Sequence, residues 1–152
     1  MRTSGTTWTV RAFERHDADA VVSLWHEAGL TRPWNDPHED IERKLRVQPE
    51  LFLVAEMPSA DDMNRLVGTV MAGYDGHRGW LYYLATSPDL RGAGIGRALV
   101  SEAERRLTEM GCPKVQLMVR RGNEAVLDFY DQLGYERFDV ANTGKRLISD
   151  VR

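Results

Sequence analysis

Hydrophobic side chains follow two different periods along this chain, and each period predicts one type of element. Five segments are short and apolar or alternating, as strands are: 7–13, 51–56, 66–74, 80–86 and 114–119. Four longer segments repeat apolar residues every three to four positions, as one helix face does: 17–29, 36–45, 95–110 and 123–133. Two further strands are predicted over 135–140 and 145–149. Strands interleaved with helices and hairpins predict an α/β domain with a mixed sheet.

Polar residues mark where three of these helices begin. Asp17 is predicted to cap the first helix, and Asn123 the last. Asp36 is followed by Pro37 and Glu39, which is the spacing of a capping box with proline at the first helical position. The sequence therefore predicts helix starts as well as helix faces.

Composition narrows the class of protein. The 152 residues favour one compact domain over residues 1–152, and no apolar run is long enough to span a membrane. A net charge of −3 argues against a nucleic-acid partner. The single cysteine, Cys112, and the absence of an apolar leader predict a cytoplasmic protein without disulfides. The four histidines show no metal-ligand spacing, so no metal is expected.

The candidate chemistry centres on a glycine-rich turn, Arg91-Gly92-Ala93-Gly94-Ile95-Gly96, between a predicted strand and a predicted helix. Glycines let the backbone approach an anion closely, because no Cβ intrudes. The free N–H groups of a first helical turn point at such an anion, and the helix dipole favours its negative charge. The turn therefore predicts a diphosphate-binding site.

Two familiar phosphate motifs fail on spacing. The dinucleotide fingerprint needs a third glycine where Arg97 stands. A Walker-type loop needs lysine and then serine or threonine after its last glycine, and Gly96 is followed by Arg97 and Ala98. A plain strand-to-helix turn remains the alternative at this point.

The pattern Arg91-x-x-Gly94-x-Gly96 resembles the acetyl-CoA signature of the GNAT superfamily of N-acetyltransferases. The flanks are similar too, because 84–88 match the strand and proline that lead into this signature, and 123–135 match the family's second motif. The segment at 32–37 resembles the corresponding segment of a small YpeA-type bacterial subgroup of the family. The resemblance covers most of the chain.

The resemblance implies a single-domain α/β GNAT fold. Its central sheet would be mixed and mostly antiparallel, with about seven strands, about four flanking helices and a splay between strands 4 and 5. It also implies transfer of an acetyl group from acetyl-CoA to a primary amine, on a small molecule or a protein, by direct transfer in a ternary complex. A non-catalytic acyl-CoA-binding module is the alternative. A homodimer is compatible with this reading.

Several residues receive a role from the resemblance alone. The backbone of 84–86 would pair with the pantetheine arm, and the Leu84 N–H would stabilise the oxyanion unless it serves the sheet ladder. Tyr130 would protonate the leaving thiolate, its alternative being a core aromatic. Asn123 would touch the cofactor arm while capping its helix. The cofactor-binding set is Leu84, Ala85, Thr86, Arg91, Gly92, Ala93, Gly94, Ile95, Gly96, Arg97, Asn123 and Tyr130.

The general base stays unassigned. Relatives often place a glutamate on the fourth or fifth strand, and the matching residues here are Trp80 and Met118, which do not titrate. Bulk solvent, a side chain or an ordered water could take the proton instead. The side chains considered are Asp75 and His77, and Tyr82 or Tyr83 is considered as a residue that orders the water.

The acceptor amine is expected near the loop at 31–36, which Pro33 within it and Pro37 after it stiffen. Trp34 would form an apolar wall and Asp36 would attract an ammonium group, with Asn35 between them. Packing by Trp34 and helix capping by Asp36 are the alternatives. Asp75 is a fourth candidate for substrate binding.

Overall fold

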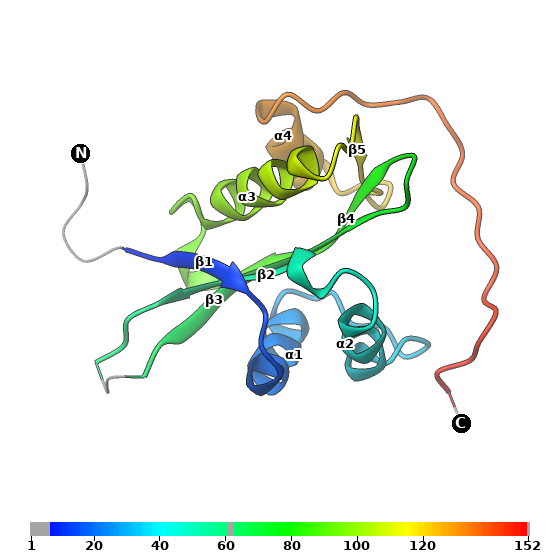
Figure 1. The fold of residues 1–152 in the computed structure, drawn as a ribbon. Coiled ribbons are helices and arrows are strands. Elements are labelled where there is room, and N and C mark those ends of the chain that lie inside the picture. The colour runs from blue at the N-terminus through cyan, green and yellow to red at the C-terminus, as the bar shows by residue number, and fades with distance from the viewer. Residues whose placement is uncertain (1–6, 61–62, 152) are drawn as a thin grey trace.

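The structure, a computed structural model, describes residues 7–60 and 63–151. One sheet runs through it, with α1 (Ala18–Glu27) and α2 (Pro37–Leu45) on one face and α3 (Ile95–Glu109) and α4 (Glu124–Gln132) on the other (Figure 1). The strands of the described part are β1 (Thr9–Ala12), β2 (Phe52–Met57), β3 (Arg65–Tyr74), β4 (Gly79–Thr86) and β5 (Val115–Gln116). No helix within these ranges is long and apolar enough to cross a membrane.

The sheet is mixed, as the sequence predicts. Its order is β1-β2-β3-β4-β5, and the first three pairings are antiparallel whereas β4 and β5 are parallel. Pairing between β4 and β5 is limited to two positions, Gly79 opposite Val115 and Trp80 opposite Gln116. The expected splay between the fourth and fifth strands is therefore confirmed, as are the four α-helices among the described residues.

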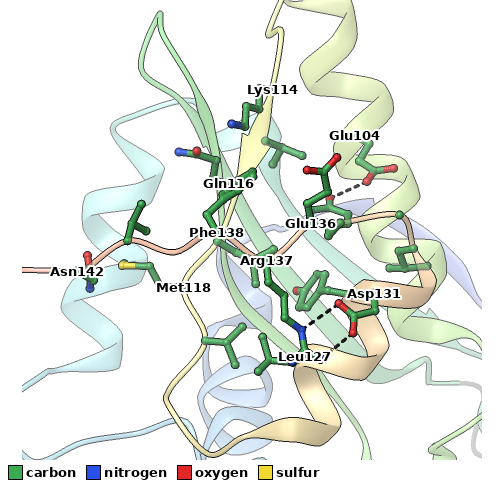
Figure 2. Close-up of a pocket in the computed structure, with 18 residues that line it drawn as sticks. Glu104, Lys114, Gln116, Met118, Leu127, Asp131, Glu136, Arg137, Phe138 and Asn142 are labelled. Carbon is green, nitrogen blue, oxygen red and sulfur yellow. Dashed lines mark hydrogen bonds and ion pairs between the residues drawn. The ribbon is translucent and has the colours of Figure 1, made fainter.

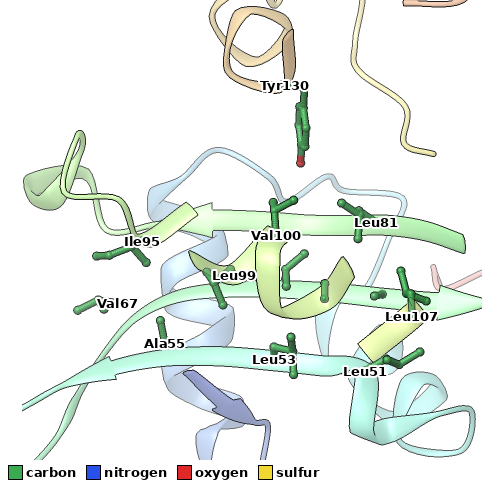
Figure 3. Packing of buried hydrophobic residues seen from close by; sticks show 13 residues of the cluster. Leu51, Leu53, Ala55, Val67, Leu81, Ile95, Leu99, Val100, Leu107 and Tyr130 are labelled. Carbon is green, nitrogen blue, oxygen red and sulfur yellow. The ribbon is translucent and has the colours of Figure 1, made fainter. Parts of the chain in front are cut away.

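Apolar side chains fill both sides of the sheet. The larger cluster lies under α3 and includes Leu53, Val67, Leu99 and Leu107, all at most 2% exposed (Figure 3). The smaller cluster lies under α1 and includes Trp25, Val54 and a stacked pair, Phe13 and Phe52, with ring centroids 4.3 Å apart. Burial of this apolar area is the main force that holds helices on both faces.

Gly68 of β3 allows α3 to lie very close to the sheet. A methyl group at this position would come within 2.8 Å of both Ile95 Cγ2 and Leu99 Cδ1. Ile95 is the first residue of α3, and its side chain is 2% exposed. The absence of a side chain at Gly68 therefore sets the height of the α3 N-terminus above β3.

The prediction of about seven strands is wrong, because the described sheet has five. Residues 135–140 and 145–149 form no strand there, and β5 is shorter than 114–119. The C-terminal segment (136–151) instead crosses from α4 to α2 as an extended chain (Figure 1). Side-chain anchors hold it in place of a ladder, since Arg137 binds Asp131 at 2.7 Å and Asp150 binds Arg43 at 2.6 Å.

Helix capping is predicted correctly at two of three positions. The Asp36 carboxylate accepts a hydrogen bond from the His38 N–H at 2.9 Å, and the Asn123 side chain accepts one from Val126. Asp17 stands at the N-cap position of α1 as predicted, but its side chain makes no capping hydrogen bond there, so the predicted capping role is wrong. Burial alone would raise the pKa of Asp17, but hydrogen bonds from the Arg11 guanidinium hold it below its usual value.

Candidate active site

The glycine turn builds an uncapped helix N-terminus. Gly92 and Gly94 both have left-handed backbones, with φ of 81° and 92°, which glycine adopts without steric cost. The first intrahelical bond of α3 runs from the Ala98 N–H to the Gly94 carbonyl at 3.0 Å. The N–H groups of residues 95–97 therefore have no acceptor within the helix. Among the described residues no side chain caps α3, and its first turn carries no acid.

The other members of the glycine turn are not equivalent. The Ala93 N–H donates to the Leu90 carbonyl inside the turn at 3.2 Å. Ala93 therefore helps to shape the turn, and its N–H is not available to a bound anion. Arg91 and Arg97 are exposed, and neither makes an ion pair with the part of the chain that the structure describes. Two guanidinium groups are therefore free to add charge beside the amides of the turn.

Three elements of the proposed donor site meet at Gly96. A methyl group there would lie 3.7 Å from Thr86 Cγ2 at the end of β4 and 3.3 Å from Phe129 Cζ of α4. Gly96 thus brings the start of α3 against β4 and against the residue next to Tyr130. The structure places the residues of the two predicted motifs side by side at this point.

β4 carries a bulge at Leu84. Thr69 pairs with Ala85 and Met71 with Tyr82, so Tyr83 and Leu84 both stand opposite the single residue Val70. Because β5 pairs only with the start of β4, no strand in the described structure covers the outer edge of β4 at this level. The bulge and the splay together leave backbone groups of β4 facing a gap in the sheet.

Tyr130 presents a protonated and unpartnered hydroxyl. Its side chain is 5% exposed and makes edge contacts with Phe129 and Tyr135, at centroid distances of 5.0 and 5.2 Å. Burial raises the pKa of the Tyr130 phenol above its usual value, which keeps the proton on at neutral pH. The hydroxyl points toward the sheet (Figure 3), and it makes no hydrogen bond with residues 7–60 or 63–151.

A cavity of about 660 Å³ lies beside this site rather than in it. It opens between β5, α4 and residues 134–142, and Arg137 and Asp131 pair across its rim (Figure 2). Of the predicted donor-binding residues, only Tyr130 is among those that line it. Because the glycine turn is absent from that lining, we do not assign the cavity to the donor.

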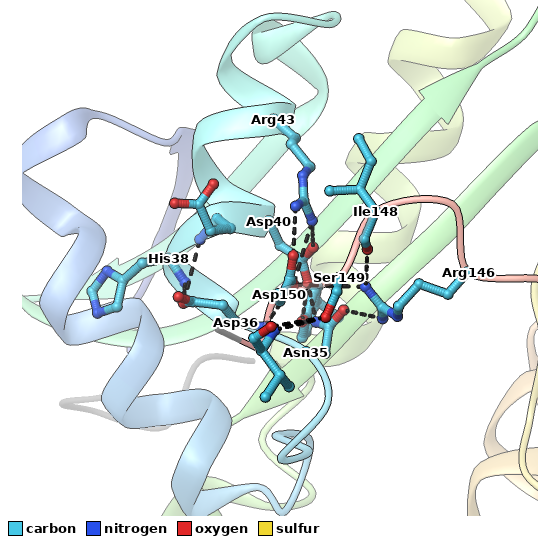
Figure 4. A network of polar contacts seen from close by, with 12 residues as sticks. Asn35, Asp36, His38, Asp40, Arg43, Arg146, Ile148, Ser149 and Asp150 are labelled. Carbon is cyan, nitrogen blue, oxygen red and sulfur yellow. Dashed lines mark hydrogen bonds and ion pairs between the residues drawn. The ribbon is translucent and has the colours of Figure 1, made fainter.

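The predicted acceptor loop (31–36) is joined to the C-terminal segment (Figure 4). The Asp36 N–H donates to Asp150 Oδ2 at 2.8 Å, and Arg146 Nη2 donates to Asn35 Oδ1 at 3.1 Å. The Asp36 carboxylate caps α2, which is the alternative to ammonium binding that the sequence left open. Trp34 is 53% exposed, so its indole is available to a ligand rather than packed in the core.

Sequence reasoning missed the polar cluster around Tyr83. The Tyr83 hydroxyl donates to Asp40 Oδ2 at 2.6 Å and accepts from Asn35 Nδ2 at 3.1 Å, and Asn35 Nδ2 also donates to Asp40. Burial, reinforced by Asp40, raises the pKa of Tyr83 above its usual value. Asp40 and Tyr83 are 43 residues apart, and no local pattern in the sequence links them.

Asp75 and His77 lie at the opposite end of β4 from Leu84. The Asp75 carboxylate accepts hydrogen bonds from the backbone of His77 and Arg78, which lower its pKa and fix the turn before β4. At about 3.3 Å per residue, the five steps from Gly79 to Leu84 span roughly 16 Å of strand. At this distance from Leu84, the role that the structure supports for Asp75 is to fix the turn before β4. Within the described ranges no group of three or more possible metal ligands gathers.

Comparison with known proteins decides the family. Residues 18–135 match the acetyltransferase (GNAT) family, which is most of the chain. The chain belongs to this family. An acetyltransferase of Pectobacterium atrosepticum is 52% identical over 141 residues, covering 93% of this chain and 96% of the relative.

Solved structures agree on the GNAT fold. The NatC complex bound to Gag peptide and CoA superposes with a TM-score of 0.74 at 21% identity, covering 88% of this chain and 87% of that one. AAC(6')-Iy in complex with the bisubstrate analogue CoA-S-monomethyl-acetylneamine also gives 0.74, at 16% identity and covering 93% and 99%. This GNAT protein is therefore an acetyltransferase, and its family transfers acetyl groups from acetyl-CoA. The curated relatives favour an enzyme over a non-catalytic binding module.

Proposed function

We propose that this GNAT protein transfers the acetyl group of acetyl-CoA to a primary amine while both substrates are bound. The observation that carries the proposal is the meeting of three elements at Gly96. There the uncapped start of α3 comes so close to the end of β4 and to the helix of Tyr130 that a methyl group on Gly96 would contact Thr86 and Phe129. No cysteine or serine is needed as a nucleophile, because the amine itself can attack a thioester.

Donor binding falls to the glycine turn and β4. The N–H groups of residues 95–97 bind the pyrophosphate, and Arg91 and Arg97 add charge. The pantetheine amides pair with the free edge of β4 at 84–86, as an added strand would. The gap left by the short β5 is where this arm enters.

Bond changes follow from that placement. The neutral amine attacks the thioester carbon, and the Leu84 N–H stabilises the negative charge that develops on the carbonyl oxygen. A C–N bond forms, the C–S bond breaks, and Tyr130 gives its proton to the departing thiolate. The nitrogen releases a proton to solvent, and the Tyr130 phenolate recovers one from solvent. The net products are an acetylated amine and free CoA thiol.

The acceptor class is a primary amine that binds beside Trp34. The exposed indole provides an apolar wall, and Asn35 and Asp36 provide polar groups on the same loop. The two structural neighbours hold different bound groups, Gag peptide in one and an acetylneamine analogue in the other. We therefore propose an amine of a small molecule or of a protein.

A thiol-release assay tests this function. Purified protein is incubated with acetyl-CoA and a panel of amines, and free CoA thiol is measured. Tyr130→Phe should lower kcat by about 10²–10⁴, the usual contribution of a general acid, with the acetyl-CoA Kd unchanged. Tyr135→Phe is the matched control, because it loses a hydroxyl from the neighbouring ring that hydrogen-bonds Glu104 instead. If the two variants change kcat equally, Tyr130 is not the general acid and its role is packing.

A further inference from the structure

Tyr83 has an unusual backbone conformation immediately before the proposed oxyanion donor. Its φ is 53°, and among the described non-glycine residues only Gln48 shares such a positive value. A side chain in this left-handed region is sterically strained, and the strain persists only where the surroundings impose it. The groups that hold Tyr83 therefore decide the shape of the bulge.

A buried hydrogen-bond chain holds the carbonyl of Tyr83. Trp25 Nε1 donates to Thr69 Oγ1 at 2.9 Å, and Thr69 Oγ1 donates to the Tyr83 carbonyl oxygen at 2.8 Å. Trp25 and Thr69 are both fully buried. Because the indole N–H already donates to it, the threonine hydroxyl has its own proton left for Tyr83. The Thr69 side chain thus donates to the Tyr83 carbonyl, whereas in a regular sheet a backbone N–H of β3 would do so.

The ring of Tyr83 is held as well. It stacks on Trp25 with ring centroids 3.7 Å apart and an interplanar angle of 11°. At the far end its hydroxyl donates to Asp40 at 2.6 Å. The side chain is therefore fixed by α1 along its face and by α2 at its tip, and only its peptide group depends on Thr69.

The geometry of the peptide bond carries this constraint to Leu84. The Tyr83 carbonyl and the Leu84 N–H belong to one planar trans peptide unit, so they point in opposite directions. With the carbonyl bound to Thr69 of β3, the Leu84 N–H must point away from β3. That direction is the open edge of β4, where β5 does not pair.

We propose that Thr69 is a positioning residue, which aims the Leu84 N–H at the reacting carbonyl by binding the other end of the same peptide group. This inference rests on the proposed function. Thr69 does not touch either substrate. Its hydroxyl keeps the peptide of Tyr83 and Leu84 from rotating, so the donor is already oriented when the thioester arrives.

The test compares two substitutions of Thr69. Thr69→Val keeps the shape and removes the hydroxyl, whereas Thr69→Ser keeps the hydroxyl and removes a methyl group. Loss of an oxyanion donor costs about 10²–10³ in kcat, so Thr69→Val should lose up to that amount. The KM for acetyl-CoA should stay within a few-fold of wild type, and Thr69→Ser should restore most of the rate. Should Thr69→Val fail to fold, Thr69→Cys replaces it, because a thiol is a weak donor.

Thermal melts and the Tyr130→Phe variant complete the comparison. A purely structural Thr69 would lower the melting temperature of Thr69→Val without changing kcat of the folded enzyme, and that result overturns the inference. If Tyr130→Phe slows transfer while Thr69→Val and Thr69→Ser turn over equally, only the positioning role fails. If wild type releases no thiol with any amine, the proposed function fails, and the positioning role falls with it.

Discussion

Replacing Gly68 by alanine should loosen the donor site through packing alone. The new methyl group would lie 2.8 Å from side-chain carbons of Ile95 and Leu99 and 3.3 Å from the Ala85 carbonyl oxygen. Neither side chain can move aside, because both are at most 2% exposed. We expect α3 to shift outward at its first turn, where the anion-binding amides stand.

The magnitude follows from the contacts. Overpacking a tight core costs about 1–3 kcal/mol, and the gain from replacing glycine by alanine in a strand is only about 0.5–1 kcal/mol. Gly68→Ala should therefore be destabilised by up to about 2.5 kcal/mol. Gly73→Ala on the same strand is the matched control, because its methyl group would meet nothing closer than 3.7 Å. That variant should be as stable as wild type or slightly more so.

Two measurements check this reasoning. Urea unfolding without ligand gives the stability of both variants, and calorimetry gives their affinity for acetyl-CoA. Gly68→Ala should lose stability and bind acetyl-CoA more weakly, whereas Gly73→Ala should do neither. If Gly68→Ala matches Gly73→Ala in both, Gly68 does not set the position of α3.

Three other perturbations have defined outcomes. Burial lowers the pKa of Lys44 to about 8, so wild type should gain stability as the pH rises from about 8 toward 10.5. Lys44→Met should be more stable at pH 7, by at most about 3 kcal/mol, and urea unfolding at pH 9.5 should show a smaller advantage. Asp150→Asn weakens the pair with Arg43, so trypsin should cut sooner within 145–147, with little change in melting temperature. Trp34→Ala should raise the KM for an acceptor amine, leave the acetyl-CoA Kd unchanged, and cost little stability because the indole is exposed.

Periodicity predicted the elements whose hydrogen bonds are local or whose faces are buried. The four helices and the first four strands belong to this class, and so do the capping by Asp36 and the glycine turn. The C-terminal strands were wrong for a physical reason. Alternation at 135–140 and 145–149 shows that a segment can be extended, but a strand also needs a neighbouring edge. Here charged side chains such as Asp150 hold the segment against α2, away from a free strand edge.

The bulge in β4 lay beyond sequence reasoning altogether. It depends on the register between β3 and β4, which places Tyr83 and Leu84 opposite Val70. Thr69 and Trp25 look like ordinary members of a strand and a helix face, and their joint hydrogen bond appears only in three dimensions. Asp17 is a similar case, because Arg11 of β1 competes for the carboxylate that would have capped α1.

Strand order in the sheet equals strand order along the chain, and this bears on how the protein assembles. Neighbours from β1 to β4 are consecutive strands, and the hairpins of β2, β3 and β4 close within residues 52–86. Contacts of low sequence separation form quickly, so we expect this meander to order early during folding. Helices α3 and α4 dock later and bring the glycine turn and Tyr130 with them. Amide hydrogens in that late layer should exchange faster than those of β2 and β3, and a bound donor should slow exchange there alone.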